Sequence, residues 1–351
     1  MKSTLSMLFI IVAILALALV GCSSQSGTSE SSDSESNTSN NNSNTSEEEK
    51  VEEHKLLLGT SSQGGTYYVW GGGWADIIGK NVPGTDVAVE VTGGPTANIQ
   101  LIESGDMDLG FVTAWLGGEA YNGEGWTDQK HTKIRSIFPM YASVMHMYSL
   151  KDNGITSISD LNGNNISTGG PGSTSAEGGN GLLEVLGIKP ARVSAIPTNT
   201  AVDGLRDGTI DAGFAVTGLP GPFMLDLETT QEVQHIGLTE EEMKKALEKY
   251  PYWSEAIIPN GTYKHQEEDI LLPGFWNIAI GSSELPEDLV YNLVKTTFEK
   301  HEDLLAVDPS AKETLVENVK YSTIPYHPGA IKYYKEVGIE IPDHLMPPEA
   351  Q

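Results

Sequence analysis

The chain has 351 residues, 38% of them hydrophobic, and a formal net charge of −27. A chain of this length can bury a sizeable core and has room for two lobes. Such an acidic chain repels phosphate backbones and anionic lipid headgroups, which excludes nucleic-acid binding as a function class. The net charge does not exclude an anionic ligand, because local backbone amides bind anions in proteins of any net charge.

The N-terminus has the layout of a secretory signal. Lys2 precedes a short apolar run that ends in Leu-Val-Gly-Cys, similar to a bacterial lipobox, and Cys22 is the only cysteine. We expect residues 1–22 to be a lipoprotein signal peptide and Cys22 to be acylated, for example with palmitate. The alternative is an uncleaved signal anchor, but the run is short for a membrane span.

A polar segment follows the cysteine. Residues 23–54 are rich in Ser, Asn, Thr and Glu and have almost no apolar side chains. Such a segment buries too little apolar surface to offset the entropy of ordering. We expect a disordered tether with a root-mean-square reach of roughly 30 Å.

The first half of the remaining chain predicts alternating strands and helices. A buried strand at 55–59 leads into a Gly-rich turn and then a helix, in which large apolar side chains recur at helical spacing from Tyr67. A strand at 87–91, a helix at 99–104 and a strand at 108–112 follow. This β-α-β-α-β order predicts parallel strands.

The same order recurs further along the chain. We expect a strand at 165–168, a Gly-rich turn at 169–175 and a helix to Leu186, followed by a strand at 193–196, a helix near Leu205 and a strand at 211–216. Residues 102–111 and 205–214 also share Gly, Asp, Gly and Phe in register. This match has a simpler explanation, because any helix-turn-strand corner favours Gly and Asp. However, each of the two segments follows its own Gly-rich turn, and we therefore favour two similar lobes.

Two long apolar strands, 134–150 and 275–282, are expected to cross between the lobes. Pro286 and Pro328 each open a helix after the second crossing. The predicted fold class is therefore α/β, with two lobes joined by a two-segment hinge. We assign residues 55–144 and 270–351 to the first lobe and residues 145–269 to the second.

Four loops form the candidate binding site. The turn at 59–66 has the Gly spacing of a phosphate-binding loop, but Gly65 stands where that loop needs Lys, which argues against an NTPase. Free amides and the positive end of a helix remain, and they suit a carboxylate. The other loops are 92–95, 169–175 and 217–220. The loops 92–95 and 217–220 lie just after a strand in each lobe, at the edge where open α/β sheets bind ligands. The candidate ligand-binding residues are Gly65, Thr66, Tyr67, Thr92, Gly93, Trp115, Gly172, Ser173, Thr174, Ser175, Thr217 and Gly218.

Several polar and aromatic side chains have two interpretations. Trp115 follows a strand and is either a wall of the cleft or a core residue, and Asn98 is either a helix-surface residue or points inward. His146 and His327 are expected to be structural, the latter at a helix start. The sequence contains no His-Glu-x-x-His or Gly-x-Ser-x-Gly motif and no candidate cysteine nucleophile. We therefore expect no catalytic activity, no bound metal and no cofactor.

The chain resembles the TAXI family, the extracytoplasmic solute receptors associated with TRAP transporters. The resemblance rests on a series of short motifs in order: Gly-Gly-Thr-Tyr-Tyr at 64–68, Thr-Gly-Gly at 92–94, Ala-Tyr-Asn-Gly at 120–123, Pro-Gly-Ser at 171–173, Tyr-Pro-Tyr at 250–252, Ile-Pro-Asn-Gly-Thr-Tyr at 258–263 and His-Pro-Gly-Ala at 327–330.

The resemblance implies a type II periplasmic-binding-protein fold, a ligand such as glutamate or a related dicarboxylate, and a TRAP permease as partner. Family contacts would fall on Gly65, Thr66, Tyr67, Thr92, Gly93 and Ser173. The chain departs from the family pattern at Pro95, at Thr174-Ser175 and at Ala114-Trp115. These departures remove two hydrogen-bonding positions and add an aromatic side chain.

The sequence therefore predicts a monomeric solute-binding lipoprotein on the extracytoplasmic face of the bacterial membrane. It would close two lobes over a small organic anion and deliver it to a permease. One rival is a secreted hydrolase with Ser173 as nucleophile, which would need a nearby base that the neighbouring sequence does not supply. Another is an adhesive or scaffold lipoprotein, which would not require two matched Gly-rich turns.

Overall fold

The computed structural model describes residues 52–350. The predicted signal peptide, Cys22 and most of the predicted tether lie outside the described residues. The first strand begins at His54, so the last residue assigned to the tether belongs to the sheet. Between residues 52 and 350, no helix has both the length and the hydropathy needed to cross a membrane.

One mixed sheet runs through both lobes, in the order β2-β1-β3-β10-β4-β7-β5-β6, with β8 on β4 and β9 on β10. Its strands are β1 (His54–Gly59), β2 (Thr85–Glu90), β3 (Leu109–Thr113), β4 (Ile134–Leu150), β5 (Asn165–Ser167), β6 (Arg192–Ser194), β7 (Ala212–Thr217), β8 (Val233–Ile236), β9 (Ser254–Ile258) and β10 (Ile270–Ser282). The predicted parallel pairs are confirmed, since β1 pairs in parallel with β2 and β3, and β5 with β6 and β7.

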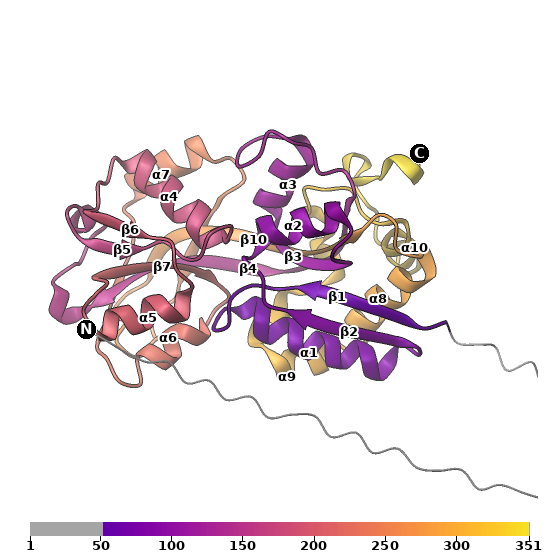
Figure 1. Ribbon diagram of the computed structural model, residues 1–351, viewed down its shortest axis with the longest axis horizontal. Coiled ribbons are helices and arrows are strands. Elements are labelled where there is room, and N and C mark those ends of the chain that lie inside the picture. The colour runs from indigo at the N-terminus through magenta and orange to yellow at the C-terminus, as the bar shows by residue number, and fades with distance from the viewer. Residues whose placement is uncertain (1–51, 351) are drawn as a thin grey trace, which may run out of the picture. The chain divides into compact units, whose positions relative to one another are not determined.

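The long strands β4 and β10 pair antiparallel and connect the lobes, as predicted (Figure 1). On one side β10 continues the sheet to β3, and on the other β4 continues it to β7. Nearly every residue of β4 is buried, which explains why its sequence is an almost unbroken apolar run. Each lobe is thus attached through strands that both lobes share.

The first lobe has helices on both faces of its strands (Figure 1). Its helices are α1 (Thr66–Asn81), α2 (Pro95–Ser104), α3 (Ala114–Asn122), α8 (Glu287–Glu299), α9 (His301–Val307) and α10 (Pro328–Glu336). The apolar stripe of α1 is buried as its spacing predicts, with Trp70 and Trp74 packed against Phe138 of β4. The C-terminal helices α8 and α10 bury their apolar faces in the same core.

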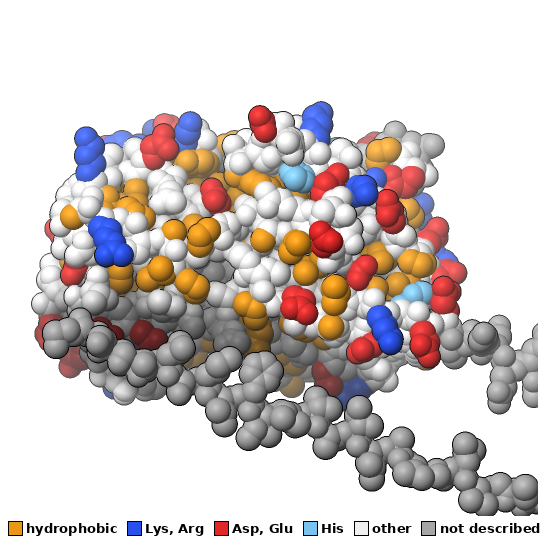
Figure 2. Space-filling view, viewed as in Figure 1, with side chains coloured by type: hydrophobic (Ala, Val, Ile, Leu, Met, Phe, Trp, Pro, Cys, Tyr) orange, Lys and Arg blue, Asp and Glu red, His pale blue; other side chains and the backbone are white. Residues whose placement is uncertain are grey.

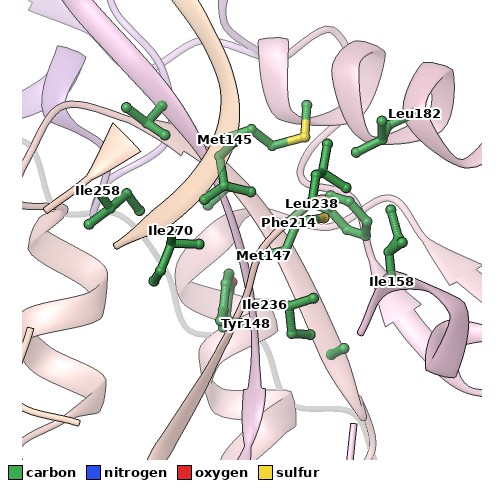
Figure 3. Close-up of a cluster of buried hydrophobic side chains, with 14 of the residues drawn as sticks. Met145, Met147, Tyr148, Ile158, Leu182, Phe214, Ile236, Leu238, Ile258 and Ile270 are labelled. Atoms are coloured by element: carbon green, nitrogen blue, oxygen red, sulfur yellow. The ribbon is translucent and has the colours of Figure 1, made fainter. Parts of the chain in front are cut away.

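The second lobe surrounds β5, β6 and β7. Its helices are α4 (Thr174–Leu186), α5 (Thr198–Arg206), α6 (Pro222–Leu227) and α7 (Glu240–Lys249). Figure 3 shows its core, where Met145 and Met147 of β4 lie among side chains from several elements, including Leu182 of α4 and Phe214 of β7. This core is separate from the one beneath α1.

The surface shows no concentration of basic side chains on the face drawn in Figure 2. Asp and Glu side chains lie among Lys and Arg there, with small hydrophobic groups between them. This distribution is consistent with the acidic composition of the chain.

Candidate ligand-binding site

A cavity of about 130 Å³ lies between the two lobes. Nine predicted site residues line it: Gly65, Thr66, Tyr67, Thr92, Gly93, Ser173, Thr174, Ser175 and Thr217. Gly172 and Gly218 lie beside it, where the Gly172 carbonyl accepts from the Thr96 amide and the Gly218 amide donates to Thr66. The four loops therefore meet at one place, as their positions after strands predict.

Four helices begin at this cavity. The first residues of α1, α2, α4 and α5, namely Thr66, Pro95, Thr174 and Thr198, all line it. The amides of a first helical turn lack partners within the helix, and the aligned peptide dipoles make this end positive. In α2, Pro95 has no N–H and the Thr96 amide already donates to the Gly172 carbonyl. The cavity therefore has a positive potential of backbone origin.

The cavity has no charged side chain. Among the described residues that line it, none is Lys, Arg, His, Asp or Glu. Any charge on a ligand must be compensated by backbone amides, hydroxyls and helix ends.

Thr66 connects the lobes. Its hydroxyl lies 2.7 Å from the hydroxyl of Thr217, at the end of β7, and accepts a hydrogen bond of 3.1 Å from the Gly218 amide. A second contact joins α2 to the loop before α4, where the Thr96 hydroxyl donates to the Gly172 carbonyl over 3.2 Å. These hydrogen bonds cross between the lobes beside the cavity.

Thr92 is fixed by the fully buried side chain of Asn98. The Asn98 amide nitrogen donates to the carbonyls of Gly59, Thr60 and Phe111, and its oxygen accepts from Thr92 over 2.7 Å. Asn98 thus points inward, the second of its two interpretations. It connects the end of β1, the middle of β3 and the loop after β2 without lining the cavity.

Ser173 caps helix α4. Its hydroxyl accepts from the Ala176 amide over 3.1 Å and donates to the Gly170 carbonyl over 2.7 Å. An N-cap serine of this kind fixes where the helix begins and satisfies one of its first-turn amides. Both partners of this hydroxyl in the described part of the chain are backbone groups.

The crossing strands supply lining residues that the sequence analysis missed. Asn277 of β10 accepts from the Tyr67 hydroxyl, and its amide nitrogen donates to the Ser143 hydroxyl over 2.7 Å and to the Tyr141 carbonyl over 2.8 Å. Burying a polar side chain within an apolar strand costs free energy unless the side chain is hydrogen-bonded, so such a residue has a structural or functional reason. The isolated Asn within Phe-Trp-Asn-Ile at 275–278 could therefore have indicated a residue that lines the site.

Tyr141 is the one lining residue in this region whose buried hydroxyl has no hydrogen-bond partner in the described part of the chain. Its ring is 0% exposed. Burial raises the pKa of Tyr141 well above its usual range, although the nearby Thr66 hydroxyl opposes the shift, so the phenol stays protonated and remains a donor.

The structure does not bring Trp115 to the cavity. Trp115 lies in the first turn of α3, where it lines a separate pocket together with residues of α4, and its ring stacks on Phe275 with centroids 5.8 Å apart. Its indole N–H donates to Glu119 over 2.6 Å. Trp115 is a core residue, the second of its two interpretations, because α3 turns its first aromatic side chain towards α4.

Both singled-out histidines have structural partners. The two ring nitrogens of His146 lie 2.9 Å from the Val144 carbonyl and 2.7 Å from the Tyr263 hydroxyl. His327 accepts from the Gly329 amide over 3.1 Å and caps α10, as its position before Pro328 predicts. Burial lowers the pKa of each imidazole to about 4, so both are neutral at pH 7.

Two solved structures have the same fold. MatC from Rhodopseudomonas palustris, solved with bound malate, is 13% identical with a TM-score of 0.54, and the match covers 81% of this chain and 96% of MatC. The periplasmic binding protein BugD is 15% identical with a TM-score of 0.50, over 83% of this chain and 100% of BugD. At such low identity the likeness concerns the fold alone, and the fold is that of two-lobed periplasmic binding proteins. Residues 58–338 match the model of the NMT1-like family, and the chain therefore belongs to the NMT1-like family.

Proposed function

We propose that this protein is an extracytoplasmic solute-binding receptor that captures a small carboxylate between its lobes and delivers it to a membrane permease of the TRAP type. The observation that carries the proposal is the interlobe cavity at which four helices begin and which no charged side chain lines among the described residues. A small anion suits such a site, because helix ends and free amides stabilise negative charge.

The assignment of the permease to the TRAP type rests on the motifs that resemble the TAXI family. The solute-binding role is supported by the fold that the chain shares with MatC and BugD. We further propose that Cys22 is acylated and anchors the receptor, and that the lobes comprise residues 55–144 with 270–351 and residues 145–269. The proposed ligand contacts are the predicted residues that line the cavity, with Tyr141, Ser143 and Asn277 added.

The rival hydrolase receives no support from the site. Both hydrogen bonds of the Ser173 hydroxyl go to backbone groups, and the lining supplies neither a His nor a carboxylate to act as base. A binding role requires neither group.

Calorimetry with matched pairs of small acids and their amides tests the proposal. Full-length protein would be purified in detergent, unfolded in guanidinium to remove bound solute, and refolded. We expect an acid such as succinate to bind at least about 10-fold more tightly than its neutral amide of the same size, since each charge-assisted hydrogen bond contributes about 1.5–3 kcal/mol. Equal affinity for acid and amide would contradict a carboxylate receptor.

A further inference from the structure

Two kinds of small carboxylate differ in the groups that they require from a binding cavity. α-Amino acids carry an ammonium group beside the carboxylate, whereas hydroxy and oxo acids of the same size do not. An ammonium taken out of water needs a carboxylate or several well-placed acceptors to compensate its charge. Among the described lining residues, no Asp or Glu is available for this role.

Asp308 is the acidic residue that acts on Tyr141, and it does not replace a lining carboxylate. Its charge contributes to the raised pKa of Tyr141. However, Asp308 is buried outside the lining, and its Oδ1 accepts from the Ser310 amide over 2.8 Å, where it caps a short 3-10 helix (Pro309–Glu313). An ammonium in the cavity would find no direct contact with this carboxylate.

The helix ends make an ammonium still less favourable. Each of the four helices presents its positive end to the cavity. The potential that attracts a carboxylate repels an ammonium placed at the same site. Hydroxyls and carbonyls in the lining could accept hydrogen bonds from it but would not neutralise its charge.

The volume sets the size of the ligand. An engineered apolar cavity of about 150 Å³ in another protein holds benzene, so a cavity of comparable volume suits roughly six to ten non-hydrogen atoms. The present value of about 130 Å³ fits a small hydroxy or oxo acid in that range.

We propose that the ligand is a small carboxylate without a charged amino group, a hydroxy or oxo acid, and that the Tyr141 hydroxyl donates a hydrogen bond to it. This inference rests on the proposed function and narrows its substrate class. Tyr141 is suited to the role because its hydroxyl is buried at the cavity and makes no hydrogen bond of normal geometry within the described chain. The Thr66 hydroxyl lies near it, but that hydroxyl is engaged by Thr217 and the Gly218 amide, and the hydroxyls of Thr92 and Ser173 also have partners.

Sets of acids that differ only at carbon 2 test the substrate class. Calorimetry on the refolded full-length protein would compare glutamate with 2-hydroxyglutarate and 2-oxoglutarate, aspartate with malate, and alanine with lactate and pyruvate. We expect a hydroxy or oxo acid to bind at least about 10-fold more tightly than its amino counterpart. Tighter or equal binding of an amino acid would overturn the inference and leave the proposed carboxylate receptor intact. If no acid in any set binds, the proposed function itself fails.

A pair of tyrosine variants tests the donor. Tyr148 is the matched control, because its hydroxyl is also buried without a partner in the described chain but lies in the core of the second lobe. We expect Tyr141→Phe to weaken binding of the preferred acid about 10-fold without lowering the unfolding temperature, and Tyr148→Phe to leave affinity unchanged. If Tyr141→Phe binds like the unchanged protein, or if both variants weaken binding equally, Tyr141 is not the donor.

Discussion

The hydroxyl pair Thr66–Thr217 is predicted to stabilise the closed state through two hydrogen bonds that cross between the lobes. Replacing Thr66 by Val keeps the shape of the side chain but removes the contact with Thr217 and the acceptor for the Gly218 amide. Each bond contributes about 0.5–1.5 kcal/mol net, so Thr66→Val should weaken ligand binding about 5- to 150-fold. Thr217→Val removes only one of the two bonds and should weaken binding about 2- to 12-fold.

A double-mutant cycle measured by calorimetry isolates this interaction. Because both single variants lose the same hydroxyl pair, the double variant should bind about as weakly as Thr66→Val alone. Thr85→Val is the control, since the Thr85 hydroxyl is buried without a partner in the described chain and lies on β2, away from the cavity. Purely additive effects, or single variants that bind like the control, would refute the reasoning.

Three further predictions concern the anchor, the closure and the pH dependence. Cys22→Ala should release a folded protein from the membrane, and an unmodified Cys22 in the mass spectrum of the mature protein would contradict acylation. Gly172→Ala should weaken ligand binding more than Gly187→Ala, because both positions have positive φ but only at Gly172 would a Cβ collide with the Thr96 hydroxyl of the other lobe. His327→Asn should keep the α10 cap and reduce the loss of unfolding free energy between pH 6.5 and 4, as measured by urea titration.

The sign of that pH dependence follows from the lowered pKa of His327. The folded-state value of about 4 lies below the usual value of about 6.5, so the unfolded chain binds the proton first as the pH falls. Stability is therefore lost between pH 6.5 and 4, by up to about 3 kcal/mol for this residue. If the unfolding free energy of His327→Asn changes with pH as steeply as that of the unchanged protein, burial of this imidazole does not determine the acid sensitivity.

The sequence predicted most of the elements because their signals are local. The apolar run at 134–150 coincides with β4, and Pro286 and Pro328 lie at the starts of α8 and α10. Helix α7 was missed although Thr239 and Glu242 form a capping box, a local signal that could have been used.

The side chains of the site were harder to predict because their roles depend on tertiary contacts. Nothing local distinguishes the Thr66 hydroxyl, which pairs with a residue 151 positions away, from a hydroxyl free to bind a ligand. Likewise, Trp115 follows a strand in sequence, and only the packing of α3 against α4 and β10 places it in the core.

The last prediction concerns the motion that admits the ligand. Lining residues come from both lobes, and the cross-lobe hydrogen bonds of Thr66 and Thr96 lie beside the cavity, so a solute enters most easily when the lobes separate. The lobes are connected through β4 and β10, whose pairing shifts register between Trp276 and Ile278 and again before Ile280. Such irregularities bend a strand pair locally, which makes this part of the crossing the expected hinge.

Ligand binding should therefore reduce the radius of gyration measured by small-angle scattering, because the ligand stabilises the closed arrangement over an open one. Thr66→Val, which weakens the closed state, should show a larger radius than the unchanged protein without ligand and should approach the same closed value at saturation. An identical radius with and without saturating ligand, in both proteins, would mean that the cavity is rigid. The affinity losses expected for Thr66→Val and Gly172→Ala would then have to come from the shape of the pocket and not from closure.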